Sequence, residues 1–83
     1  MSNLSRTFVL DAFAPYAPSD VDDPSAVRYY GFIRADGAWY IQKEDTSVSP
    51  TTYRYIKGTD DYATNWTGRA GLTYGYFHEV FDS

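Results

Sequence analysis

The dipeptide Asp36-Gly37 constrains the fold of this chain more than any other sequence feature. It lies between two runs rich in aromatic and β-branched residues, 28–35 and 38–44. Such runs favour β-strands, and Asp-Gly between them is typical of a tight hairpin in which both turn residues have positive φ. The sequence therefore predicts a central β-hairpin over residues 28–44.

A two-residue turn would also fix the register of this hairpin, because turn length decides which residues face each other. Arg34 would then oppose Trp39 as a cation–π pair, and Phe32 would oppose Ile41. Side chains alternate between the two faces of a sheet. The predicted core face carries Tyr30, Phe32, Arg34, Trp39, Ile41 and Lys43, and the predicted second face carries Tyr29, Gly31, Ile33, Tyr40 and Gln42.

The remaining elements are expected to complete a small sheet. Residues 52–57 alternate as a third strand, and residues 72–77 alternate as a fourth. Between them, Asp60 or Asp61 is placed to cap a short helix over about 61–69. The predicted fold class is a β-dominated α+β fold. It has a small antiparallel sheet of three to four strands, one short helix and an extended N-terminal arm.

The chain divides into an arm or linker, 1–27, and a β-rich domain, 28–83. The first part holds three of the four prolines and three of the sixteen aromatic residues. Residues 14–27 are expected to be an irregular, extended connector because proline biases its neighbours toward extended backbone. The apolar run 6–13 is either a segment that docks on a neighbouring molecule or a strand that folds back on its own sheet.

Size and charge narrow the function classes. A single domain of 83 residues is stabilised by only about 3–5 kcal/mol without disulfides, a metal or assembly. The chain has no cysteine, which leaves assembly as the expected source of further stability. Its net charge of −4 disfavours nucleic acid and anionic membranes as partners. The N-terminus lacks the pattern of a signal peptide.

No group of polar residues indicates catalysis or metal binding. The single histidine, His78, lies near the C-terminus, and a zinc site or a nucleophilic triad needs further ligands or partners. Asp20, Asp22 and Asp23 do not follow a calcium-loop pattern and are interpreted as a solvated acidic linker. We therefore expect a non-enzymatic protein without catalytic, cofactor or metal site.

Tyrosine is the unusual feature of the composition. The chain has nine tyrosines, and residues 28–83 hold only six valine, isoleucine and leucine residues to surround them. Tyrosine combines an apolar ring with a polar tip and suits surfaces that bind other proteins. The candidate partner-binding residues are Tyr29, Tyr40, Tyr53 and Tyr55 on the sheet, with Phe8 and Phe13 on the arm. The alternative is a small aromatic core with its hydroxyls at the rim.

The order of aromatic motifs resembles small proteins of tailed bacteriophages. The motifs are Tyr30-Gly31-Phe32, Gly37-Ala38-Trp39-Tyr40-Ile41-Gln42-Lys43, Tyr55-Ile56-Lys57-Gly58, Asp61-Tyr62, and Trp66-x-x-Arg69-x-x-Leu72-x-Tyr74. The resemblance covers residues 28 to about 77 and supplies no functional residues. It implies a virion structural or accessory protein of the tail or head, with Trp39, Trp66, Arg69 and Tyr74 as fold-defining positions.

These observations lead to one functional hypothesis and two alternatives. The hypothesis is a virion structural or accessory protein that assembles with itself, as a homo-oligomer, or with other virion proteins through an aromatic face and the arm. Its expected location is the virion or the host cytoplasm. The alternatives are a receptor- or carbohydrate-binding module of a phage tail and a small phage protein that inhibits a host enzyme.

Overall fold

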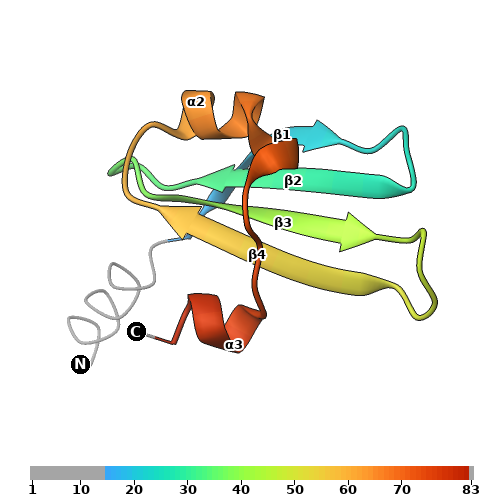
Figure 1. Cartoon of the computed structure of the whole chain (residues 1–83). Coiled ribbons are helices and arrows are strands. Elements are labelled where there is room, and N and C mark those ends of the chain that lie inside the picture. The colour runs from blue at the N-terminus through green and yellow to red at the C-terminus, as the bar shows by residue number, and fades with distance from the viewer. Residues whose placement is uncertain (1–14, 83) are drawn as a thin grey trace, which may run out of the picture.

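The computed structural model describes residues 15–82, which form a four-stranded antiparallel sheet with strands in chain order. The strands are β1 (Ala17–Asp22), β2 (Val27–Ile33), β3 (Trp39–Asp45) and β4 (Thr52–Gly58). They are followed by α2 (Tyr62–Thr67), the 3-10 turn η1 (Arg69–Gly71) and α3 (Phe77–Val80). Figure 1 shows α2 and α3 on opposite sides of the sheet. The predicted fold class is confirmed.

The central hairpin lies where the sequence predicts it, but its turn is longer than expected. The Gly37 N–H donates to the Arg34 carbonyl at 3.0 Å, and the Arg34 N–H donates to the Ala38 carbonyl at 2.7 Å. Gly37 has a φ of 96°, whereas Asp36 does not have positive φ. These features are typical of a three-residue loop that ends in a glycine bulge. The predicted two-residue turn is therefore wrong.

The longer turn shifts the register by one residue. Ile33 pairs with Trp39, and Gly31 pairs with Ile41. A shift of one residue moves the side chains of a strand to the other face of the sheet. The predicted faces of β2 are therefore exchanged, whereas the grouping of Trp39 and Ile41 on the core face is correct. The expected Arg34–Trp39 pair is also wrong, because the Arg34 guanidinium lies over the Tyr16 ring.

The core lies between the sheet and the α2–η1 segment. Its buried side chains are Tyr29, Trp39 and Ile41, of which Ile41 is completely buried. They are covered by partly buried side chains from the C-terminal part of the chain, namely Tyr62, Trp66, Leu72 and Tyr74. Helix α2 comes close to β2 at Gly31, where a Cβ atom would lie 2.9 Å from the Trp66 ring. Gly31 therefore provides the space in which α2 packs.

Strand β1 falls within the segment expected to be an irregular connector, and that expectation is wrong for residues 17–22. The strand forms an edge of the sheet, with an irregularity in register between Pro18 and Asp20. Proline is tolerated in an edge strand because its missing N–H costs no hydrogen bond within the sheet. The Tyr62 hydroxyl donates to Asp20 at 2.9 Å, and the Arg69 guanidinium pairs with Asp22 at 2.8 Å. These contacts connect β1 to α2 and η1.

The C-terminal part departs from prediction in two places. Residues 72–77 form no fourth strand; they contribute one bridge, in which Gly75 and Tyr55 exchange two hydrogen bonds of 2.8 Å at the outer edge of β4. A second short helix, α3, follows and was not predicted. The helix expected over about 61–69 is present as α2. Asp61 occupies its N-cap position but makes no side-chain capping hydrogen bond.

Candidate functional site

The candidate site is the side of the sheet that faces away from the core. Phe32, Tyr40 and Tyr55 project from three adjacent strands, and Phe77 and Phe81 from the C-terminal segment pack against them. We call these five rings, together with Tyr16 and Tyr53, the aromatic face. Tyr16 lies just before β1 and contacts the Tyr40 ring.

Tyr40 is the centre of the aromatic face. Its ring stacks on Phe32 with centroids 4.6 Å apart, and it meets Tyr16 and Phe81 edge to face at 4.9 and 5.4 Å. These distances are those of favourable aromatic pairs. Burial raises the pKa of the Tyr40 phenol, and the neighbouring Tyr55 contributes to the rise. The Tyr40 phenol therefore stays protonated and neutral at ordinary pH.

The carboxylate of one residue, Glu44, adjoins these rings on the same face. Glu44 accepts hydrogen bonds from the hydroxyls of Tyr53 at 2.8 Å and Tyr30 at 3.0 Å, and Arg28 lies 3.5 Å from it. The Tyr53 and Tyr30 hydrogen bonds hold the pKa of Glu44 below its ordinary value. The same bonds raise the pKa of both phenols. Glu44 is thus an ionised, well-bonded group that fixes the position of the Tyr53 ring.

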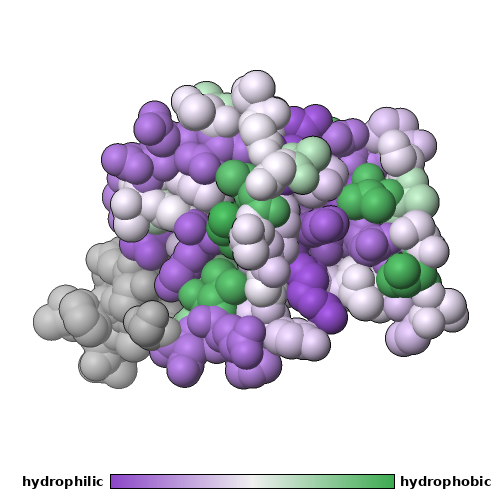
Figure 2. All heavy atoms as spheres, in the orientation of Figure 1, coloured by the Kyte–Doolittle hydropathy of each residue, from purple (hydrophilic) through white to green (hydrophobic). Residues whose placement is uncertain are grey.

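The aromatic face is only partly covered by the described chain. Helix α3 has only four residues, and β4 is the strand that it contacts most extensively. Phe77 stays 58% exposed and Tyr53 45% exposed. In Figure 2 the strongly apolar residues form separate green groups among white and purple ones. This view has the segment leading to α3 in front of the sheet, on the side where Leu72 and Tyr74 cover the core, so the divided apolar surface belongs to that side and not to the aromatic face.

The structure brings together some of the predicted site residues and separates others. Tyr40, Tyr53 and Tyr55 lie on the aromatic face, whereas Tyr29 is buried in the core on the opposite side. Phe8 and Phe13 lie outside the described residues. Sequence reasoning missed Phe32 because of the register error. It also missed Phe77 and Phe81, although their i, i+4 spacing is a helical signal.

The possible metal ligands and the acidic residues of β1 form no second candidate site within residues 15–82. Among residues 15–82, no three His, Cys, Asp or Glu side chains lie close enough together to hold a metal ion. Asp20 and Asp22, expected in a solvated linker, instead receive hydrogen bonds from Tyr62 and Arg69. Over the same residues, the helices are too short and too polar to cross a bilayer.

Comparison with protein families, curated proteins and solved structures found no match to this chain. The resemblance to bacteriophage proteins therefore stays a prediction from the sequence motifs.

Proposed function

We propose that this chain is a non-enzymatic assembly protein that self-associates through its aromatic face, as a structural or accessory component of a bacteriophage virion. The observation that carries the assembly proposal is the incomplete cover of this face. Within the described chain, only one four-residue helix, α3, covers the packed rings of this face. Phe77, which belongs to that helix, and Tyr53 on β4 both remain exposed. The placement in a virion rests on the sequence resemblance.

Physical reasoning supports self-association over an isolated existence. The described chain has only three buried apolar side chains, on the core side of the sheet. Aromatic rings bury large areas at low entropic cost, and they are enriched in protein interfaces. Covering the aromatic face with a second copy would give each chain a second apolar layer. The tyrosine hydroxyls would stay at the polar rim of such an interface.

The experiment is light scattering of the purified full chain over a concentration range, with two variants. Phe77→Ser removes the most exposed ring of the aromatic face, and we expect it to weaken association at least about tenfold. Val48→Ser removes an exposed apolar side chain from the β3–β4 loop, which contributes no ring to the aromatic face, and we expect no change. Thermal melts of both variants check that each still folds. A wild-type chain that stays monomeric at every concentration would contradict the proposal.

The two alternative functions have less support from the described residues. Neither tryptophan lies on the aromatic face, because Trp39 and Trp66 pack on the core side. A glycan-binding surface there would have to depend on tyrosine and phenylalanine. An inhibitor that mimics nucleic acid needs a strongly acidic surface, but the net charge is only −4, and two of the acidic groups, Asp22 and Glu44, are paired with Arg69 and Arg28.

A further inference from the structure

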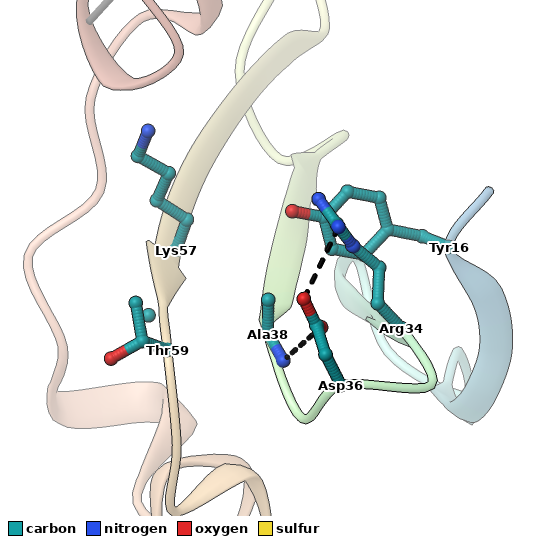
Figure 3. Close-up of a pocket in the computed structure, with 7 residues that line it drawn as sticks. Tyr16, Arg34, Asp36, Ala38, Lys57 and Thr59 are labelled. Carbon is teal, nitrogen blue, oxygen red and sulfur yellow. Dashed lines mark hydrogen bonds and ion pairs between the residues drawn. The ribbon is translucent and has the colours of Figure 1, made fainter. Parts of the chain in front are cut away.

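A shallow hollow of about 490 Å³ lies at one end of the aromatic face. Ala38 is its smallest side chain, between two long cationic residues: Arg34 on one side and Lys57 on the other (Figure 3). Tyr16 stands behind Arg34 and joins the hollow to the aromatic face through its contact with Tyr40. Its volume falls within the roughly 300–1,000 Å³ that is typical of ligand clefts.

The two cations of the hollow are less fully paired than Arg69 on the core side. Arg69 uses three guanidinium nitrogens, two on Asp22 and one on the Trp66 carbonyl. Arg34 makes one ion pair, from Nη2 to Asp36 at 3.1 Å, and its buried Nε has no hydrogen-bond acceptor among the described residues. The Nε is shielded from solvent, so a ligand would meet the guanidinium at its terminal nitrogens, of which Nη2 is shared with Asp36. Terminal guanidinium nitrogens suit a planar acceptor such as a carboxylate.

Lys57 adds a positive charge that no carboxylate within residues 15–82 neutralises at ion-pair distance. Its Nζ lies over the Phe81 ring, 5.4 Å from the centroid. The hollow therefore has two cations and one carboxylate, Asp36, in a chain whose net charge is −4. This excess of one positive charge is local, and it suits one carboxylate better than a doubly charged phosphate.

We propose that the hollow binds a carboxylate, and that its occupant in the assembly is an acidic side chain of a second copy of this chain. The choice of occupant rests on the proposed self-association and on charge complementarity, because the chain has eleven acidic residues against seven basic ones. The acid would lie between Arg34 and Lys57 while the neighbouring rings are covered. Its role would be to fix the orientation of the two copies.

The binding test uses N-acetyl-glutamate amide as the probe and N-acetyl-glutamine amide as its uncharged counterpart. Amide signals of Ala38, Gly58 and Thr59, and the Nε–H signal of Arg34, are followed by NMR. The glutamate probe should shift these signals and the glutamine probe should not. Equal shifts with both probes, or none with glutamate, would overturn the carboxylate site.

Two matched variants separate the hollow from general charge effects. Lys57→Met removes a cation from the hollow. Lys43→Met removes a similar cation, whose Nζ lies 5.6 Å from the centre of the Tyr74 ring on the core side. We expect Lys57→Met to weaken both glutamate binding and self-association about tenfold, the scale of one charge-assisted hydrogen bond, and Lys43→Met to change neither.

The two proposals can fail separately. If the chain self-associates and both lysine variants associate equally, the second copy does not place an acid in the hollow, and the aromatic-face proposal stands. If the wild type does not self-associate, the proposed function and this choice of occupant fail together. The glutamate titration then decides independently whether the hollow is a carboxylate site.

Discussion

The contact between Gly58 and Trp39 provides a sharp test of the core. The Trp39 indole is 3% exposed and lies flat against β4, where a Cβ atom on Gly58 would come within 2.5 Å of Cε2 and 2.8 Å of Nε1. The indole cannot move away easily, because its Nε1 donates to the Asp60 carbonyl. Gly58→Ala should therefore force the ring or the strand to shift.

The expected cost follows from overpacking. Inserting a methyl group into a well-packed core costs about 1–3 kcal/mol, and the fixed indole places this site at about 2–3 kcal/mol. That is roughly half the free energy of unfolding of a domain this small, about 3–5 kcal/mol. With a urea slope of about 1 kcal/mol per molar, the unfolding midpoint should fall by about 2–3 M.

Urea unfolding followed by tryptophan fluorescence measures this change. Gly71→Ala is the matched control, because a Cβ there would meet no atom within 4 Å. It should be neutral or stabilising by less than about 1 kcal/mol, since alanine restricts the unfolded chain. A Gly58→Ala midpoint equal to that of the wild type would refute the packing of Trp39 on β4.

Three further predictions concern charged and titrating groups. Burial and the Asp20 hydrogen bond raise the pKa of Tyr62 from 10.0 to about 12. The protonated Tyr62 side chain therefore contributes its full stabilisation below pH 10, and this stabilisation is lost as the pH rises toward 12. In urea titrations across that range, the free energy of unfolding should depend less on pH for Tyr62→Phe than for the wild type. The same pH dependence in both proteins would contradict the prediction. Asp22→Asn and Arg69→Gln should show a coupling free energy of about 1 kcal/mol in a double-mutant cycle, and additive effects would mean that the pair does not hold β1. The lowered pKa of Glu44 gives stability that is present above pH 4.5 and is lost as pH falls, so Glu44→Gln should lose less stability on acidification, by the same urea assay.

The hairpin shows how far local sequence determines this fold. The two runs around Asp36-Gly37 predict the strands and their pairing, but Asp-Gly is compatible with both a two-residue and a three-residue turn. Side-chain contacts favour the longer one: Asp36 accepts the Ala38 N–H at 3.0 Å and pairs with Arg34. A difference of one residue in turn length is small locally, yet it exchanges the faces of β2 and so moves Tyr29 from the expected second face to the core.

The strand β1 could not be predicted because its stabilising contacts are distant in sequence. Pro18 and the neighbouring aspartates argue against a strand when they are considered locally. Asp20 and Asp22 find their partners in Tyr62 and Arg69, 42 and 47 residues away. Of the candidate site, Tyr40, Tyr53 and Tyr55 could be predicted from composition and alternation. The contributions of Phe77 and Phe81 depend on the path of the C-terminal segment past β4.

A dilution series of the full chain by NMR tests the central claim most directly, because it shows both whether copies associate and where. We predict that amide shifts on dilution gather on the aromatic face, at Tyr53, Tyr55 and Phe77, and leave the exposed residues Ala63 and Thr64 of α2 unchanged. A spectrum that does not depend on concentration, or shifts that gather on α2, would contradict assembly through the aromatic face.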